Sequence, residues 1–457
     1  MSATTAFESD ADGLPVPQRY LAVAVLLIGL VIVVLDGAIA NIALPSIAAS
    51  FGASAADAVW VVSSYQLGVL VSLLPCGVLG EKFGPRRVYL AGVLVFVLAS
   101  AGCAFALSLP MLVASRFLQG SGGGAIMALA AMNLRFVVPQ RLLGTIIGVN
   151  AMTIAIASAA GPGLAGAILS VARWPWLFAI NLPIGALVLL AGGALASTKG
   201  IARRLDARAL VANALLFVLL FLGADRLASS PLIGIALMVG SALCLVVLLR
   251  LERGSASPLL PVDLLADPTF RVAFIASICC FAGQMLSYVA LPFFLQRTLA
   301  MTPIEAGLYM MPWPAAVIVI APLSGRLANR FSTSWLCTIG GALLALGLAL
   351  VTLAPAQLRT EAFLAGTVLA GLGFGLFQTP NNRVLLLSAP KARSGAAGAM
   401  QGTARLLGQT IGAISMSLIF GFWPVTAAPI IALAIAAAAA ALASIVSLSR
   451  VRYERTA

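Results

Sequence analysis

The stretch LAVAVLLIGLVIVVLDGAIANIALPSI, residues 21–47, decides the fold, because an unbroken apolar run ends in Asp36 and then continues. An apolar segment of about 20 residues is long enough to cross a bilayer as a helix. A carboxylate within such a segment costs about 2.5–3.5 kcal/mol to insert, and a charge placed there at that cost indicates function. The stretch therefore predicts a membrane helix that carries a buried acid.

The composition extends this pattern to the whole chain. Of 457 residues, 61% are hydrophobic and 9% are charged, and the mean hydropathy is +1.09. A soluble domain carries about 25% charged residues. The apolar runs are continuous rather than alternating, which predicts a helix bundle and not a barrel. We expect an all-α integral membrane protein in contact with the lipid bilayer.

The apolar runs predict fourteen membrane spans. With the N-terminus in the cytoplasm, 21 of the 27 Lys and Arg residues fall in cytoplasmic segments, four in external loops and two inside spans. This bias follows the positive-inside rule and predicts that both termini are cytoplasmic. The spans begin near Tyr20, Asp57, Val88, Leu109, Gly144, Trp174, Arg208, Pro231, Arg271, Pro303, Ser334, Ala362, Gly395 and Pro424.

The same topology explains the net charge of +13 without a nucleic-acid partner, since no loop mixes basic and aromatic residues as an RNA or DNA platform does. The first 19 residues hold three acids before Arg19 and no cleavage site follows the first run, so a cytoplasmic tail is expected instead of a signal peptide. The six cysteines lack metal-ligand spacing and the chain has no His, so no metal site is expected.

Two segments resemble each other at corresponding places in the two halves of the chain. GVLGEKFGPRRVYLAG, residues 77–92, follows the second span, and PLSGRLANRFSTSWLCTIGG, residues 322–341, follows the tenth. Repeated halves are typical of secondary transporters, whose substrate sites lie between the halves. The alternative is that any tight hairpin at a basic membrane face favours Gly and Arg.

Five segments together resemble the major facilitator superfamily, specifically its fourteen-helix drug–proton antiporter branch. The resemblance covers the chain from Tyr20 to Arg450, with Glu81 where the family's loop motif usually has Asp. The segments are LDGAIANIALPSI (35–47), GVLGEKFGPRR (77–87), ASRFLQGSGGG (114–124), AIASAAGPGLAGAIL (155–169) and WPWLFAINLPIG (174–185).

The resemblance implies two six-helix bundles around a central cavity, with two extra helices between them. It implies a bacterial cytoplasmic-membrane antiporter that works as a monomer and exports small amphipathic, often cationic compounds in exchange for protons, without a cofactor. The expected parts are a tail (1–19), a first bundle (20–200), the inserted helices (201–253), a second bundle (254–450) and a tail (451–457).

The resemblance also assigns motif residues. The loop motif implies a gate at the cytoplasmic face, with Gly84 allowing the turn, and its alternative is charge that only sets topology. The span-five motif implies helix packing that restricts leak, and its alternative is a simple kink at Pro162. The gating residues are Gly77, Glu81, Gly84, Arg86 and Arg87, and the antiporter-motif residues are Gly161, Pro162 and Gly166.

Asp36 and Arg116 are expected at similar depths. At 1.5 Å per residue, Asp36 lies about 24 Å from the cytoplasmic end of its span and Arg116 about 10 Å from the external end of its own. Burial favours the protonated acid and a nearby arginine favours the carboxylate, so Asp36 can titrate usefully near neutral pH. We predict that Asp36 carries the proton and that Arg116 tunes it. The alternative is a static ion pair.

Further polar and aromatic residues recur at helical spacing and are candidates for the wall of the substrate cavity. In span thirteen, Gln401, Arg405 and Gln409 stand four residues apart on one face. The alternatives are hydrogen bonds between helices or ordinary core packing. The candidates are Gln119, Phe281, Gln284, Met285, Tyr288, Trp313, Gln378, Gln401, Arg405 and Gln409.

The leading function is therefore proton-coupled export of amphipathic drugs or toxic compounds. The alternative is export of one endogenous metabolite, siderophore or lipid by the same fold. An enzyme is not expected, because the sequence offers no nucleophile, metal cluster or pair of acids near the surface. ATP use is not expected either, because no GxxxxGK[ST] segment occurs.

Overall fold

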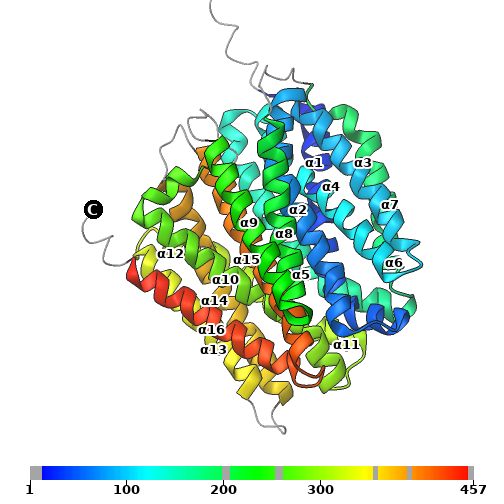
Figure 1. Ribbon diagram of the computed structural model, residues 1–457. Helices are drawn as coiled ribbons and strands as arrows, with labels where there is room; N and C mark the ends of the chain where they lie inside the picture. The colour runs from blue at the N-terminus through cyan, green and yellow to red at the C-terminus, as the bar shows by residue number, and fades with distance from the viewer. Residues whose placement is uncertain (1–12, 198–205, 253–260, 354–358, 389–393, 451–457) are drawn as a thin grey trace, which may run out of the picture.

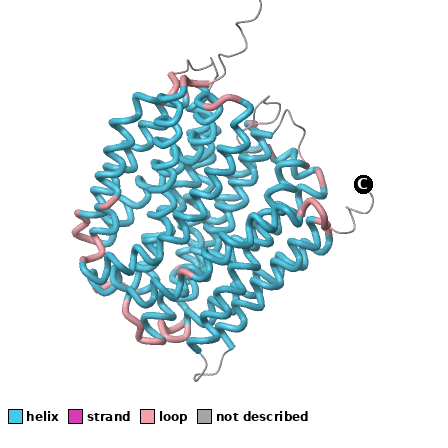
Figure 2. The backbone as a smooth tube through the Cα atoms, turned by 180° about the vertical axis from the view of Figure 1, so that it is seen from behind, coloured by secondary structure: helices cyan, strands magenta, loops and turns pink. Residues whose placement is uncertain are grey.

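The computed structural model describes residues 13–197, 206–252, 261–353, 359–388 and 394–450, and within these residues every regular element is helical (Figure 2). Twelve helices in this part of the chain are long and apolar enough to cross a membrane. The predicted all-α membrane class is confirmed. The predicted count of fourteen spans is not.

Two helices account for the difference between twelve and fourteen. Helix α4 carries Arg116, Gln119 and a run of glycines, which lower its hydropathy, and α5 is counted only as a shorter apolar helix over Ile156–Val171. The tails at 1–12 and 451–457 lie outside the described residues, as do eight basic residues of the charge count: Lys199, Arg203, Arg204, Arg253, Lys391, Arg393, Arg452 and Arg455.

The helices before residue 200 lie together on one side of the molecule, blue to cyan in Figure 1. The predicted sixth span is not one helix but α6, α7 and a 3-10 turn at Gly192–Ala194. The helices are α1 (Val16–Phe51), α2 (Ala55–Phe83), α3 (Pro85–Ala104), α4 (Leu109–Val137), α5 (Gln140–Val171), α6 (Trp176–Ala179) and α7 (Asn181–Ala191).

Most helices from α10 onward form the other side, α11 lies below the helices of the first half, and α8 and α9 cross the front of Figure 1. The predicted tenth span breaks into α11 and α12 at Met311, since Pro312 lacks the N–H that would continue the helix. The bounds are α8 (Ala207–Ser229), α9 (Pro231–Leu251), α10 (Pro268–Phe293), α11 (Pro303–Met310), α12 (Pro312–Leu327), α13 (Thr333–Leu353), α14 (Arg359–Leu387), α15 (Ser394–Phe422) and α16 (Ala428–Ser449).

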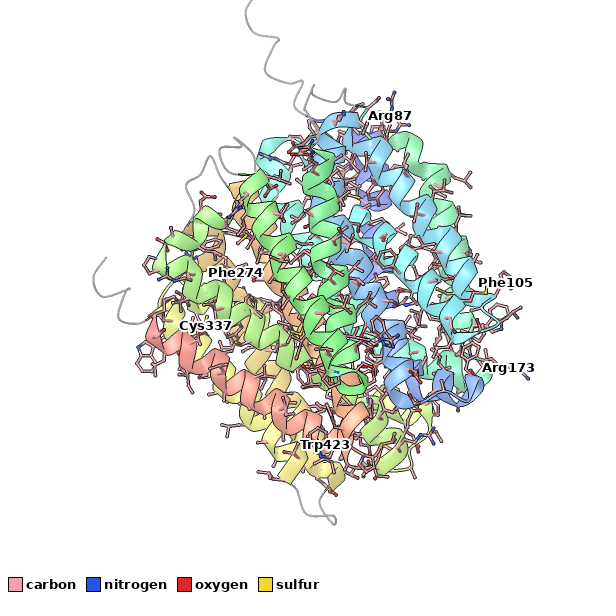
Figure 3. The ribbon with its side chains drawn as sticks, viewed as in Figure 1. Arg87, Phe105, Arg173, Phe274, Cys337 and Trp423 are labelled. Carbon is pink, nitrogen blue, oxygen red and sulfur yellow. The ribbon has the colours of Figure 1, made fainter. Side chains whose placement is uncertain are left out.

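Residues labelled in Figure 3 mark the two opposite ends of the molecule. Figure 3 shows Arg87 at one end and Arg173 and Trp423 toward the opposite end. We call these the Arg87 end and the Arg173 end. Gly84, which has a φ of 92°, joins α2 to α3 at the Arg87 end in a backbone conformation that favours glycine.

A shared apolar core joins the two sides of the molecule near the Arg173 end. One cluster of buried residues includes Ile42, Val61 and Ala165 from the first half and Phe294 and Ala306 from the second. Gln296 also donates a hydrogen bond of 3.1 Å across this junction to the carbonyl oxygen of Ile42. The two halves are therefore sealed together at the Arg173 end in this conformation.

Glycines bring α2 and α4 into backbone contact. A Cβ at Gly120 would lie 2.1 Å from the carbonyl oxygen of Tyr65, and a Cβ at Gly68 would lie 2.2 Å from that of Phe117. Real Cβ atoms do not approach backbone oxygens so closely, so even alanine forces the helices apart. This contact holds Tyr65 beside Arg116, which lies one turn before Gly120 in α4.

Gly120→Ala is expected to lower the free energy of unfolding by about 1–3 kcal/mol, because overpacking a close helix contact shifts the backbone. Gly77→Ala in α2 is the matched control, since nothing lies within 4 Å of a Cβ there. Thermal unfolding of purified protein in detergent measures both. Equal melting temperatures for the two variants would contradict the contact.

Candidate functional site

Asp36 and Arg116 form a buried ion pair between α1 and α4. Their side chains are 1% and 0% exposed, and Nη1 of Arg116 contacts Oδ2 of Asp36. The two residues predicted to share a depth are thus brought together by the fold. Charges are seldom buried unless they are paired, and here each provides the other's counter-ion.

The second carboxylate oxygen of Asp36 accepts two more hydrogen bonds. Gln119 of α4 and Asn181 of α7 each donate to Oδ1 of Asp36 at 2.8 Å. The amide of Gln119 also donates to the hydroxyl of Ser100 in α3 at 2.8 Å. Four helices, α1, α3, α4 and α7, therefore meet around one carboxylate.

Arg116 is held by more than its ion pair. Its Nε donates to the carbonyl oxygen of Val61 at 3.0 Å, and its Nη1 to Oε1 of Gln119 at 2.6 Å. Its guanidinium carbon lies 4.3 Å from the ring centroid of Tyr65 and 5.3 Å from that of Phe178. Stacking on two rings stabilises a cation, and the Nη2 group is left with no hydrogen-bond partner among the described residues.

This arrangement has two chemical states. With Asp36 ionised, the pair is neutral and the four helices are joined through the carboxylate. Protonation of Asp36 removes the ion pair, while Val61, Gln119 and the two rings still hold the arginine in place. A proton can thus change the contacts of α1 with α4 and α7, while the charge of Arg116 stays against the rings of Tyr65 and Phe178.

Gln119 was predicted to line the cavity wall, and that role stays a prediction. It is fully buried and belongs to the Asp36 network, because it lies one turn from Arg116 on the same face of α4. Phe281, Met285 and Trp313 are likewise 3%, 3% and 1% exposed and pack in the apolar core in this conformation, and their role in a cavity wall stays a prediction.

The remaining cavity candidates lie in two groups. Gln284 and Tyr288 are on α10, where the ring of Tyr288 meets that of Trp313 with centroids 5.2 Å apart. Oε1 of Gln284 and Nε1 of Trp313 are buried without hydrogen-bond partners among the described atoms. The other group is half-buried and comprises Gln378 of α14 and Gln401, Arg405 and Gln409 of α15.

The span-five motif packs α5 against both halves of the molecule. A Cβ at Gly161 would lie 2.5 Å from Cβ of Ala38 in α1, and a Cβ at Gly166 would lie 2.9 Å from Cα of Ile304 in α11. Across this contact, a Cβ at Gly307 would lie 2.4 Å from the carbonyl oxygen of Pro162. These positions lie near the Arg173 end, so the motif forms part of the seal there.

The loop-motif residues lie at the Arg87 end. Glu81 is half-buried in the last turn of α2, and Arg86 and Arg87 occupy the first turn of α3, half-buried and exposed respectively. Gly77 faces open space. The structure places the motif at one end of the helix bundle, and its role as a gate stays a prediction.

Several residues of the site were not predicted from the sequence. Asn181 lies inside the quoted segment 174–185, where an amide in an apolar run was a usable signal. Ser100 and Tyr65 carry no comparable signal, since single hydroxyls are common in membrane helices. Gly307, which faces Gly166, could not be assigned without knowing that α11 crosses α5.

Comparison with known proteins gives two similar relatives across most of the chain. The uncharacterized transporter YebQ of Escherichia coli (strain K12) is 43% identical over 415 residues, covering 89% of this chain and 90% of that protein. The multidrug resistance protein Stp of Mycobacterium tuberculosis (strain ATCC 25618 / H37Rv) is 32% identical over 409 residues, covering 87% and 75%.

The fold has a counterpart among solved structures. A POT family transporter in complex with 5-aminolevulinic acid matches with a TM-score of 0.69 at 14% identity, covering 94% of this chain and 96% of that one. The family model of the Major Facilitator Superfamily matches residues 26–261 and 273–456. The chain therefore belongs to the Major Facilitator Superfamily.

Proposed function

We propose that the protein is a proton-coupled antiporter that exports amphipathic compounds from the bacterial cytoplasm. The observation that carries the proposal is the buried carboxylate of Asp36, held by Arg116, Gln119 and Asn181 at the meeting point of three helices. Export is supported by the likeness to the multidrug resistance protein Stp. Proton coupling is supported by the two states available to the Asp36 pair.

Asp36 is the acid best placed to carry the proton. The other described carboxylates lie near helix ends or between helices: Asp57, Glu81, Asp206, Asp225, Glu252, Asp263, Asp267, Glu305 and Glu361. An ionisable group in the middle of a membrane protein is costly and is characteristic of proton relays. We assign Arg116 the role of counter-ion to the deprotonated state.

Alternating access requires a seal that opens on one side while the other closes. In this conformation the Arg173 end is sealed by α5 against α11, where Gly166 and Gly307 allow backbone contact. We propose that the Arg87 end faces the cytoplasm, with both termini on that side. The structure then represents a state closed to the exterior, in which Asp36 releases its proton to the cytoplasm as substrate binds. Asp36 takes up the next proton from the exterior once the opposite state has opened and the substrate has left.

We also propose that α4 and α5 cross the membrane, which gives fourteen spans. Helix α4 has 29 residues and α5 has 32, and both are long enough to span a bilayer at 1.5 Å per residue. The polar residues that lower the hydropathy of α4 are Arg116 and Gln119, and both are buried against protein. Their cost in lipid is therefore avoided.

The proposal is tested in proteoliposomes with an imposed pH gradient. The panel contains four compounds of different charge. Three of them share one aromatic body, namely pyrenebutyrate, pyrenebutanol and pyrenebutylamine, and the fourth is ethidium. We expect uptake of at least one compound that depends on the pH gradient and collapses when nigericin dissipates it. Uptake that is unchanged by nigericin, or no uptake of any compound beyond that of protein-free vesicles, would contradict proton-coupled export.

A further inference from the structure

Arg405 is a cation without a counter-ion. It is half-buried on α15, and no hydrogen bond or ion pair joins it to any described residue. Gln401 and Gln409, one turn away on either side, are half-buried as well, and no hydrogen bond ties either side chain to a described residue. A charge kept within a membrane protein without a partner marks a binding position.

Arg405 faces the boundary between the two halves of the molecule. One turn before it, a Cβ at Gly402 would lie 3.5 Å from Leu73 of α2. The next residue, Leu406, is buried in the same cluster as Tyr65. Arg405 is also within electrostatic range of Tyr65, whose ring stacks on Arg116. Arg405 therefore lies where the bundles meet, beside the Asp36 network.

The charges of this region do not balance. Asp36 is already neutralised by Arg116, and the other described carboxylates lie near helix ends or between helices. One positive charge is left over, that of Arg405. A binding region with an excess cation disfavours cationic ligands and favours anions, and a guanidinium matches a carboxylate in shape as well as charge.

A second group of unpaired polar atoms lies farther along the neighbouring helix. Backbone contacts at Gly408 with Ile278 and at Gly412 with Ala282 show that α15 and α10 run side by side in the same direction. A Cβ at Gly408 would contact Ile278, Phe281 and Ala282, so Gly408 is level with about residue 280 of α10. Gln284 and Tyr288 then lie about 10 and 16 Å beyond the level of Arg405 along the axis. Oε1 of Gln284 and Nε1 of Trp313 are buried and unpaired there.

We propose that the transported substrates are organic acids with an aromatic body, the acid group bound by Arg405 and the body placed against Tyr288 and Trp313. This inference rests on the proposed export function and replaces the expected preference for cations. The spacing suits a molecule about 10–16 Å long. Arg116 remains the counter-ion of Asp36, so the acid group of the substrate is free to pair with Arg405. An organic anion leaving a cell with a negative interior also moves with the membrane potential.

Binding of the three pyrene compounds to purified protein in detergent tests the proposal, with energy transfer from tryptophan to pyrene as the readout. The compounds share one aromatic body and end in an acid, an alcohol or an amine. For the wild type we expect pyrenebutyrate to bind at least about tenfold more tightly than pyrenebutanol, because a hydrogen bond to a charged group has about that effect. Pyrenebutylamine should bind most weakly.

Arg405→Gln should abolish the preference for the acid over the alcohol, and Arg405→Lys should retain much of it. Arg250→Gln, which removes an exposed arginine at the end of α9, is the matched control and should change nothing. The Lys variant keeps the test decisive if the Gln variant does not fold. An equal or tighter affinity for the amine, or a loss in Arg405→Gln that is the same for all three compounds, would overturn the proposal.

The outcomes separate this inference from the proposed function. If uptake depends on the pH gradient but the preference for the acid does not depend on Arg405, the proposed antiport stands and the proposed substrate class is wrong. If the preference for the acid requires Arg405 but no uptake is driven by the pH gradient, the proposed substrate class is supported and the proposed proton coupling is wrong.

Discussion

Asp36→Asn is expected to reduce uptake driven by the pH gradient to the level of protein-free vesicles. The amide of Asn can still accept a hydrogen bond from Arg116, but it does not bind and release a proton near neutral pH. Because the carbonyl oxygen of Val61 and the rings of Tyr65 and Phe178 still hold the arginine, the variant should fold, bind substrate within a few-fold of the wild type and exchange it across the membrane at equal pH. Only accumulation against a concentration gradient should be lost.

The matched control for this change is Asp225→Asn. Asp225 is a half-buried carboxylate in α8 that accepts a 2.6 Å hydrogen bond from Nε1 of Trp60, so it has a neutral partner and lies away from the Asp36 network. This variant should retain gradient-driven uptake. Loss of uptake in both variants would point to a general sensitivity of the fold, and Asp36 would lose its special role.

The second large effect is expected in stability and concerns Arg116→Gln. Removing one partner of a buried ion pair leaves the other charge uncompensated and destabilises a protein by about 3–5 kcal/mol. The variant should unfold at a clearly lower temperature than the wild type, because the carboxylate of Asp36 loses its counter-ion. Thermal unfolding followed by size-exclusion chromatography in detergent measures this loss.

The double variant Asp36→Asn/Arg116→Gln separates the ion pair from the packing of its side chains. With both charges gone, the two amides can hydrogen-bond to each other, and most of the lost stability should return. Gradient-driven uptake should stay absent, since no titratable group is left at the site. A double variant as unstable as Arg116→Gln alone would show that packing against Tyr65 and Phe178 dominates, and not the charge.

The sequence predicted the membrane class and the Asp36–Arg116 contact for the same reason. Charged residues are so rare in apolar runs that the depth of each is informative, and two opposite charges at one depth have few other partners. Gln119 was singled out because it lies one turn from Arg116, and its contact with Asp36 was not predicted. Asn181 and Ser100 join the network from α7 and α3, and their positions depend on how helices pack, which spacing within one helix does not reveal.

The differences between the predicted and the observed helices have a similar cause. Hydropathy alone undercounts α4, because the residues that serve the site make the helix look polar. The break between α11 and α12 follows from Pro312, but proline also occurs inside continuous helices of this chain, such as Pro45 of α1. Whether a proline breaks a membrane helix depends on the neighbours that can satisfy the freed backbone groups.

The most direct test of the antiporter account is the movement of protons driven by substrate alone. Proteoliposomes loaded with pyranine and with the panel compound that shows the largest uptake are diluted into compound-free buffer at equal pH, beside protein-free vesicles. The account predicts that substrate leaving wild-type vesicles draws protons inward and acidifies the interior, and that Asp36→Asn vesicles show no such change. Equal acidification by wild type and Asp36→Asn would contradict the claim that Asp36 carries the exchanged proton.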